Sequence, residues 1–490
     1  MDREASSFHN RTRERLRLTE VLESARAELF ILYGRRGVGK SALLAETLDA
    51  CGLPYLYYRA TRRTLPLQMA EVTVAVREAF PSLFLAQPLT SFQALLDLLA
   101  HLARQRHDSA DPAPLVVVID ELPYLADVEP GMLTSLQHWW DTQKRLPNLK
   151  VFLCGSTVGF MEQQVLDRNA PLYNRRTGAL KLQPLDYAEA GLFSPRQVPE
   201  ERMVRYAVLG GMPSYLEQFD DALDLPSNLL ATVLKPNTYL SEEPDWLLRQ
   251  ELRRDVLYGS MLRAVAQGDR RPSEIARTIG KRSAQDVAPF LVTLQELGLL
   301  RREVPVTEEG SVRSRNSLYF VDDPFLDFYY RFVDGSQGLV ERGMGARVWQ
   351  KTIAPQLHHY VSSPAFERAC RQYLWRALEA EQIPEEASFT HLGRWWSGDQ
   401  ELDVVALDAD RRVTLVGSCK WTSNPVDLGD YQVLLEGASR LPGASTDRRP
   451  HLALFSRSGF TARLQDLAAD PATRLLLVSL DDMYDLPKVA

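Results

Sequence analysis

Residues 34–41 read Gly-Arg-Arg-Gly-Val-Gly-Lys-Ser, which matches the GxxxxGK[ST] pattern of a phosphate-binding loop. The apolar, strand-like stretch Glu28–Tyr33 precedes this loop, and a helix-like stretch follows from Ser41. Glycines let such a loop curl so that backbone N–H groups face the phosphates, and the N-terminus of the following helix adds a favourable dipole. We therefore predict that residues 34–41 bind the phosphates of ATP.

Two side chains of the loop have specific expected roles. Lys40 is expected to reach the β- and γ-phosphates, and the Ser41 hydroxyl is expected to bind Mg²⁺. The rest of the predicted nucleotide-binding set comes from the loop and the first helical turn: Gly34, Gly37, Val38, Gly39 and Ala42.

An acidic pair, Asp120 and Glu121, directly follows the apolar residues 115–119. An aspartate at the end of a buried strand can hold Mg²⁺ through water, and a neighbouring glutamate can orient or deprotonate the attacking water. The alternative is a helix N-cap with an acidic first turn. The occurrence of the pair together with the loop favours the catalytic interpretation.

A third strand-like stretch, residues 151–154, ends shortly before Ser156. A hydroxyl at this place is expected to sense the γ-phosphate, although hydroxyls are also common in ordinary turns. The continuous apolar strands alternate with helical stretches, which predicts an α/β fold with a parallel sheet covered on both faces.

Composition limits the broad class of the protein. The 490 residues suggest about three domains. The formal net charge of -7 argues against a generally polycationic binder but leaves room for a local basic groove. The four cysteines form no CxxC pair, which excludes a zinc ribbon and a disulfide framework. The N-terminus is charged throughout and the apolar runs are strand-length, so we expect a cytoplasmic protein with no membrane partner.

The middle of the chain has a different pattern. Residues 199–254 are expected to form helices, broken by Gly-Gly-Met-Pro at 210–213. Helices are then predicted at 256–267, 272–280 and 284–297, and strands at 299–306 and 317–321. Three helices and a hairpin predict a winged helix-turn-helix over residues 255–335.

The charges of this segment leave two interpretations open. The helix at 284–297 carries no basic residue, so it does not suit reading of bases. Basic residues around it could grip phosphates: Lys281, Arg282, Arg301, Arg302, Arg313 and Arg315. Taken alone, the segment favours an internal lid or docking module, which is the second interpretation.

The last part of the chain returns to an α/β pattern. A helix is expected at 366–380 and strands at 403–407 and 413–416. Residues 398–406 (Gly-Asp-Gln-Glu-Leu-Asp-Val-Val-Ala) and 414–421 (Thr-Leu-Val-Gly-Ser-Cys-Lys-Trp) resemble the core of the PD-(D/E)XK nucleases.

That resemblance implies metal-assisted phosphodiester hydrolysis with Mg²⁺ or Mn²⁺. It assigns these roles: Asp403 and the Cys419 carbonyl as metal ligands, Lys420 as the amine that positions water, and Glu367 and Glu401 as supporting acids. The sequence departs from the pattern at Ser418, where a carboxylate is expected. A neutral hydroxyl is a poorer ligand for a hard dication, so a degenerate domain that only binds nucleic acid or a partner remains an alternative.

Five segments, which include the phosphate-binding loop, resemble the archaeal-type ATPase family, in the STAND branch of the AAA-like P-loop NTPases. They are residues 34–41 (GRRGVGKS), 116–125 (VVVIDELPYL), 151–162 (VFLCGSTVGFME), 171–185 (PLYNRRTGALKLQPL) and 210–217 (GGMPSYLE). The resemblance implies that residues 8–13 lie near the adenine, that Arg175 or Arg176 faces a phosphate, and that Pro213 contacts nucleotide. From the residues alone, paired arginines are more typical of a solvated surface.

We therefore predict an ATPase domain (1–198), a helical lid (199–254), a winged helix (255–335) and a nuclease-like domain resembling restriction endonucleases (336–490). The expected function is a nucleoside-triphosphate-hydrolysing switch that binds ATP or ADP and controls DNA binding or cleavage. The alternative is a signalling or scaffold ATPase whose catalytically degenerate C-terminal domain binds nucleic acid or a protein partner. A second copy of the chain or a protein partner is expected at the winged helix. A helicase has less support, because the sequence shows no added motor motif.

Overall fold

The computed structural model describes residues 11–108, 114–146, 148–252, 255–310, 314, 316–441 and 449–485. The chain divides into two compact units, Met1–Pro184 and Leu185–Ala490. The helices expected from residue 199 onward therefore lie in the second unit, together with α8 (Tyr187–Gly191).

The first unit is built on a five-stranded sheet in the order β2-β3-β4-β1-β5, and every pairing in it is parallel. The strands are β1 (Glu28–Tyr33), β2 (Tyr55–Arg59), β3 (Leu115–Asp120), β4 (Leu149–Gly155) and β5 (Gly178–Lys181). Every residue of β1, β3 and β4 is buried. Such runs are typical of parallel sheets covered on both faces, and the predicted parallel sheet is confirmed.

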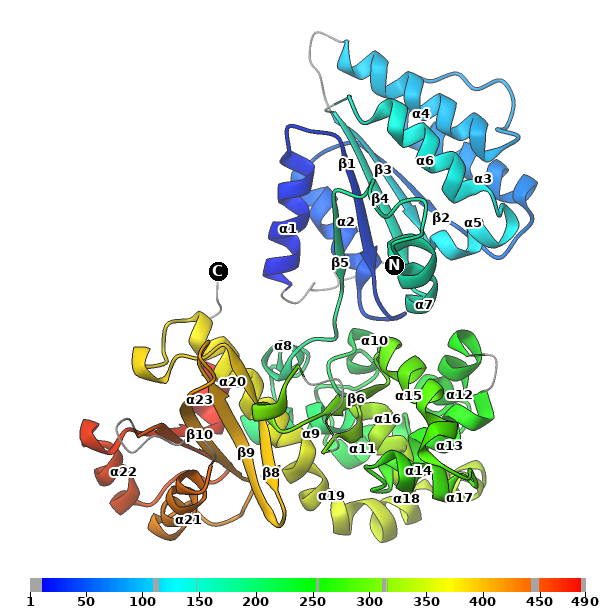
Figure 1. The fold of residues 1–490 in the computed structure, drawn as a ribbon. Coiled ribbons are helices and arrows are strands. Elements are labelled where there is room, and N and C mark those ends of the chain that lie inside the picture. The colour runs from blue at the N-terminus through cyan, green and yellow to red at the C-terminus, as the bar shows by residue number, and fades with distance from the viewer. Residues whose placement is uncertain are drawn as a thin grey trace. The chain divides into compact units, whose positions relative to one another are not determined.

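Helices cover the sheet of the first unit. Figure 1 shows α1 and α2 together beside β1, and α3, α4 and α6 beyond the other side of the sheet. The helices are α1 (Thr12–Glu23), α2 (Lys40–Cys51), α3 (Leu65–Ala79), α4 (Phe92–His107), α5 (Leu122–Val128), α6 (Met132–Gln143) and α7 (Val158–Phe160), with the π-helical η1 (Met161–Leu166). Helix α2 begins at Lys40, one residue before the prediction, because Gly39 holds the preceding left-handed position with φ 97°.

The second unit opens with helices: α9 (Pro199–Leu209), α10 (Pro213–Leu216), α11 (Leu225–Ala231), α12 (Tyr239–Glu251), α13 (Asp255–Ala266), α14 (Pro272–Thr278) and α15 (Ala284–Glu296). An antiparallel pair follows, β6 (Leu300–Glu303) and β7 (Leu318–Val321). The strand predicted at 299–306 is shorter, because Pro305 lacks an N–H and the chain turns into the 3₁₀ segment η2 (Val306–Glu308). Arg313 and Arg315 lie outside the described residues.

Short helical segments connect this hairpin to the C-terminal sheet. They are α16 (Pro324–Phe328), η3 (Tyr329–Val333), η4 (Asp334–Ser336), α17 (Gln337–Glu341), α18 (Gly345–Val348), η5 (Trp349–Ile353), α19 (Ala354–Tyr360), η6 (Val361–Phe366), α20 (Glu367–Glu379) and η7 (Glu385–Ala387). Helix α20 agrees with the helix predicted at 366–380 to within one residue at each end.

The C-terminal sheet has the order β12-β11-β10-β9-β8. Its strands are β8 (His391–Ser397), β9 (Gln400–Leu407), β10 (Val413–Lys420), β11 (His451–Ser456) and β12 (Leu475–Ser479), with helices α21 (Leu428–Ser439), α22 (Ala462–Ala468), α23 (Leu480–Asp485) and the 3₁₀ turn η8 (Pro471–Thr473). Strands β8, β9 and β10 pair antiparallel, and β10, β11 and β12 pair parallel. Both predicted strands are longer than expected, so Glu401 and residues 418–420 lie within strands.

One core cluster fills the face of this sheet that α21 and α22 cover. It includes Val405, Val416, Leu434 and Leu464, and it also takes in Val306 from η2. The turn that follows β6 is therefore packed into the C-terminal core. Within the described ranges, no helix combines the length and apolar character needed to cross a membrane.

Candidate functional site

The phosphate-binding loop follows β1 and starts at Gly34, whose φ is 149°. A Cβ at this position would lie 2.5 Å from the Leu182 carbonyl oxygen, so no larger residue fits without displacement of the backbone. The Leu182 N–H in turn donates to the Tyr33 carbonyl at 2.7 Å. The loop is therefore seated directly against the chain that leaves β5.

Lys40 is the first residue of α2 and is 6% exposed. Its Nζ donates to the carbonyl oxygens of Gly34 at 2.7 Å and Arg35 at 3.1 Å. These bonds hold the ammonium inside the curl of the loop. From there it can exchange carbonyl partners for phosphate oxygens, which are stronger acceptors because they carry charge.

Arg11 supports the loop from outside. Its Nη2 donates to the Val38 carbonyl at 3.0 Å, and its Nη1 pairs with Glu14 at 3.1 Å. Arg11 is 4% exposed and falls in the segment 8–13 that was expected near the adenine; residues 8–10 lie outside the described residues. The described part of that segment thus contacts the loop backbone, a role that the sequence did not indicate.

Asp120 ends β3 at the same edge of the sheet. Its Oδ2 accepts hydrogen bonds from the Ser41 hydroxyl at 2.9 Å and the Tyr57 hydroxyl at 2.6 Å. Its Oδ1 accepts from the Glu121 N–H at 2.9 Å. Burial, and then the Asp120 carboxylate, raise the pKa of Tyr57 well above its ordinary value, so this hydroxyl stays a donor. Tyr57 is a site residue that the sequence analysis missed.

Glu121 stands at the N-cap position of α5 in a left-handed conformation, with φ 54° and no side-chain capping bond. Its Oε2 accepts from the Ser156 hydroxyl at 2.6 Å and the Ser156 N–H at 3.4 Å. A non-glycine residue in this conformation is strained, and such strain clusters at functional sites. The geometry argues against the simple helix-capping interpretation and brings Glu121 and Ser156 together.

The two candidate arginines lie on the chain between η1 and β5. Arg175 pairs with Asp141 at 3.2 Å. Arg176 donates to the carbonyls of Tyr173 at 3.0 Å and Leu166 at 3.4 Å. Burial, and then the Glu162 carboxylate, raise the pKa of Tyr33 at the end of β1, and the Arg176 charge opposes that rise. Pro213 begins α10, in the second unit.

The second candidate site lies at the β9–β10 pair. The Asp403 Oδ2 accepts from the Cys419 N–H at 2.7 Å and the Ser418 hydroxyl at 3.2 Å. The Lys420 Nζ lies 3.3 Å from the Asp430 Oδ1 on α21. A cavity of about 490 Å³ is lined by Glu401, Asp403, Ser418, Cys419 and Lys420, whereas Asp430 is not part of its lining. The cavity therefore gathers four of the five residues assigned from the nuclease resemblance, and Glu367 lies outside its lining.

Glu367 instead contacts Arg394, which the sequence analysis did not single out. The Arg394 Nε lies 3.4 Å from the Glu367 Oε2, its Nη1 lies 3.6 Å from the Glu303 Oε2, and its Nη2 pairs with Glu401. Burial raises the pKa of Glu367. Burial would by itself raise the pKa of Glu303. The positive charges of Arg301, Arg371 and Arg394 outweigh that effect and lower the pKa to about 2.

The two sites differ in their fit to a metal ion. Among the described residues, no group of three or more His, Cys, Asp or Glu side chains is placed to hold one. The loop site does not need such a group, because Mg²⁺ bound with a nucleotide usually takes one or two protein ligands; Ser41 and Asp120 fit this role. The C-terminal carboxylates do not fit a metal as arranged, because Asp403 accepts from β10 and Glu367 and Glu401 share a guanidinium.

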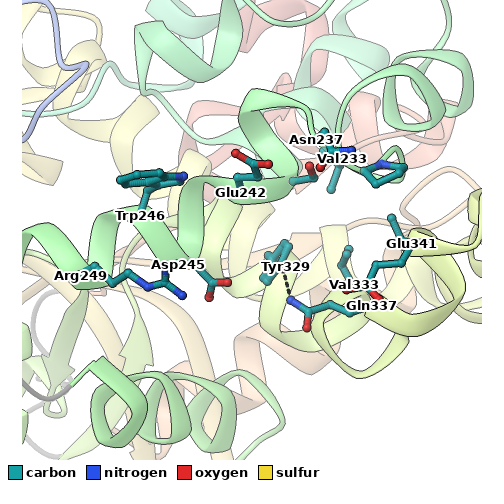
Figure 2. Close-up of a pocket in the computed structure, with 13 residues that line it drawn as sticks. Val233, Asn237, Glu242, Asp245, Trp246, Arg249, Tyr329, Val333, Gln337 and Glu341 are labelled. Carbon is teal, nitrogen blue, oxygen red and sulfur yellow. Dashed lines mark hydrogen bonds between the residues drawn. The ribbon is translucent and has the colours of Figure 1, made fainter.

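A second cavity, of about 380 Å³, lies among α12, η3 and α17 (Figure 2). Trp246 and Arg249 line it, and Gln337 donates to the Tyr329 hydroxyl at 2.7 Å. Its charged lining consists of Glu242, Asp245, Glu341 and Arg249. Three carboxylates against one guanidinium leave this lining formally negative, which opposes binding of a triphosphate.

Residues 8–219 match a family model described as an ATPase domain predominantly from Archaea. Residues 329–429 match the DUF234 model, described as archaeal and bacterial proteins of unknown function. Together with the loop, Asp120 and the parallel sheet, the first match supports a nucleotide-binding P-loop ATPase of archaeal type in the N-terminal part of the chain.

Individual proteins are also similar to this chain. The chain is 27% identical over 430 residues to the uncharacterized protein MJECL04 of Methanocaldococcus jannaschii, with 87% of this chain and 89% of that protein covered. Among solved structures it is similar to the Walker-type ATPase PABY2304 of Pyrococcus abyssi, with TM-score 0.48, 23% identity and coverage of 66% and 96%. It is also similar to the Aeropyrum pernix ORC2 protein in its ADPNP–ADP complexes, with TM-score 0.42, 14% identity and coverage of 71% and 97%.

Proposed function

We propose that this ATPase is a switch whose nucleotide state controls a C-terminal domain that binds or cleaves DNA. The observation that carries the proposal is the presence of two separate polar constellations in one chain. One joins Ser41, Asp120, Glu121 and Ser156 through hydrogen bonds, and the other joins Asp403, Ser418 and Cys419.

At the ATP site, Lys40 would pair with the β- and γ-phosphate oxygens. Ser41 and Asp120 would hold Mg²⁺, which when bound would supply positive charge against the phosphates. Glu121 takes a proton from the attacking water as the water oxygen bonds to the γ-phosphorus and the bond to the ADP oxygen breaks. Because the Ser156 hydroxyl occupies the Glu121 Oε2, Glu121 must exchange that partner for the water.

The control function rests on the parts that follow the ATPase domain. We assign residues 199–254 to a lid, 255–335 to a winged helix and 336–490 to a nuclease-like domain. Support for the winged helix comes from helices α13, α14 and α15 followed by the antiparallel hairpin β6–β7. Support for the nuclease-like domain comes from α20 before a sheet of three antiparallel and two further parallel strands.

The basic residues of the winged helix have different surroundings. Lys281 and Arg282 are exposed in the turn before α15. Arg301 pairs with Glu303 at 2.7 Å, and Arg302 donates to the Ser314 carbonyl at 3.4 Å. The turn before α15 is therefore the better candidate for phosphate contacts, which would position DNA without reading its sequence.

The second candidate is a signalling or scaffold ATPase with a degenerate C-terminal domain. Two observations favour it: the neutral Ser418 and the Arg394 guanidinium shared among carboxylates. Ser418→Glu separates the candidates. If the native protein is inert and this change creates metal-dependent cleavage, the native site is degenerate.

The proposal is tested by cleavage of single- and double-stranded DNA with Mg²⁺ or Mn²⁺, with and without ATP. Cleavage that is lost in Asp403→Ala and altered in Lys40→Ala supports an ATP-coupled nuclease. No cleavage by the native protein, with ATP hydrolysis intact, favours the scaffold.

A further inference from the structure

We propose that the Arg394 guanidinium occupies the cation position of the C-terminal carboxylates, and that a divalent cation binds there only when Arg394 is displaced. The inference rests on the proposed function in one respect, since it takes Glu367, Glu401 and Asp403 as the acids of that site. It adds that the β6–β7 hairpin holds Arg394 in place and so controls access to the site.

One guanidinium meets three carboxylates from three different elements. Arg394 comes from β8, and its nitrogens face Glu303 of β6, Glu367 of α20 and Glu401 of β9. The side chain of Arg394 is 9% exposed, as is that of Glu367. Within the described residues, the Oε2 atoms of Glu303 and Glu367 are buried without a hydrogen-bond partner, and each faces a nitrogen of Arg394.

This arrangement explains why the carboxylates do not fit a metal. A guanidinium carries one positive charge and only donates, so it satisfies acidic oxygens as a cation does. A dication at Glu367 and Glu401 would compete with Arg394 for the same carboxylate oxygen atoms. The positive charge of the Arg394 guanidinium would also repel the dication, because both would lie beside the same carboxylates.

The hairpin provides the contacts that fix Arg394. The guanidinium carbon of Arg394 lies 5.4 Å from the centre of the Phe320 ring on β7. Glu303 on β6 forms an ion pair with the same guanidinium. Next to Arg394, Gly393 lies under Val306, whose side chain would be 3.2 Å from an added Cβ. The hairpin is thus docked on β8 at the residue beside Arg394. A displacement of the hairpin would remove two contacts of the guanidinium at once.

A simple structural ion pair would give the same distances, so the test measures cation binding directly. Mn²⁺ binding to the full chain without nucleotide is followed by electron paramagnetic resonance. Arg394→Met removes the guanidinium and keeps an apolar stem, and Glu303→Gln weakens the hold of the hairpin while Arg394 stays. Arg412→Met is the matched control, because Arg412 is 69% exposed and pairs with Asp410 in the turn before β10.

We expect Arg394→Met to tighten Mn²⁺ binding by at least ~10-fold, a typical size for changes in groups that surround metal ligands. Glu303→Gln should tighten it by a smaller factor, Arg412→Met should leave it unchanged, and Asp403→Asn added to Arg394→Met should abolish the gain. Folded Arg394→Met with unchanged or weaker Mn²⁺ binding overturns the inference. If Arg394→Met does not fold, Glu303→Gln decides, and unchanged binding in it overturns the inference.

The failure of the proposed function is distinguishable from the failure of this inference. Tighter Mn²⁺ binding in Arg394→Met without DNA binding or cleavage sustains the inference and contradicts the DNA switch. If the native protein cleaves DNA but Arg394→Met does not change Mn²⁺ binding, the DNA switch is sustained and the inference about Arg394 is contradicted.

Discussion

The Ser41 hydroxyl donates a 2.9 Å hydrogen bond to Asp120, although 79 positions separate the two residues in the sequence. The contact follows from the strand order, because β4 lies between β1 and β3 and all three strands end at one edge. The same edge places Ser156, after β4, against Glu121, after β3. A loop motif and an acidic pair thus become one site through parallel pairing.

Glu121→Gln should leave ATP binding nearly unchanged and lower the rate of hydrolysis by about 10²- to 10⁴-fold, the usual contribution of a general base. Glutamine keeps the shape and can still meet the Ser156 hydroxyl, but it cannot take a proton. Phosphate release at saturating ATP and binding of a fluorescent nucleotide would be measured on the same sample. Comparable losses of binding and turnover would contradict the role of Glu121 as base.

Tyr57→Phe should weaken Mg²⁺ binding during turnover, which raises the Mg²⁺ concentration needed for half-maximal rate by roughly 10-fold. The reason is that the Tyr57 hydroxyl orients the Asp120 carboxylate through a 2.6 Å hydrogen bond. Tyr55→Phe is the matched control, since its hydroxyl bonds Asp49 on an exposed surface. Equal Mg²⁺ titrations for both variants would show that Tyr57 does not position the ligand.

Asp327 predicts a pH dependence of stability. Burial raises its pKa from 3.8 to about 6, and the neighbouring Arg270 and Arg331 only partly oppose this rise. Because the folded state then binds more protons than the unfolded state between these pKa values, stability falls as pH rises from about 4 to about 6.

Asp327→Asn removes the titration and keeps a neutral side chain of similar shape. The melting temperature of the variant relative to the native protein should therefore rise between pH 4.5 and pH 7.5, by an amount that corresponds to roughly 1–3 kcal/mol. Asp410→Asn, at an exposed ion pair, serves as the control. A difference in melting temperature that is constant with pH would exclude the assigned shift.

The sequence predicted the parts of the ATP site that are local in the chain. Residues 34–41 are consecutive, and Asp120 and Ser156 lie at the ends of apolar strands, so motif and strand pattern were sufficient to single them out as candidates. Tyr57 and Arg11 were missed because their roles depend on which strands and loops become neighbours in space. The sequence around a tyrosine in a strand does not show that its hydroxyl will contact an aspartate on the adjacent strand.

The C-terminal site shows the same limit. The sequence indicated Asp403, Ser418, Cys419 and Lys420, and the structure brings them to one cavity. It gave no sign of Arg394, because strand β8 was not recognised and because Glu303 and Glu367 reach it from distant segments. Charge pairing across three elements is set by tertiary packing, which a linear pattern does not encode.

If nucleotide state controls DNA binding, DNA affinity must differ between the ATP-bound and ADP-bound protein, and a titration measures that difference. Binding of labelled single- and double-stranded DNA to the full chain would be measured with a non-hydrolysable ATP analogue, with ADP and without nucleotide, beside Lys40→Ala. We expect DNA affinities that differ between the ATP-analogue and ADP states, and a Lys40→Ala protein whose DNA affinity no longer responds to nucleotide. Absence of DNA binding in both nucleotide states, with ATP hydrolysis intact, would contradict this expectation.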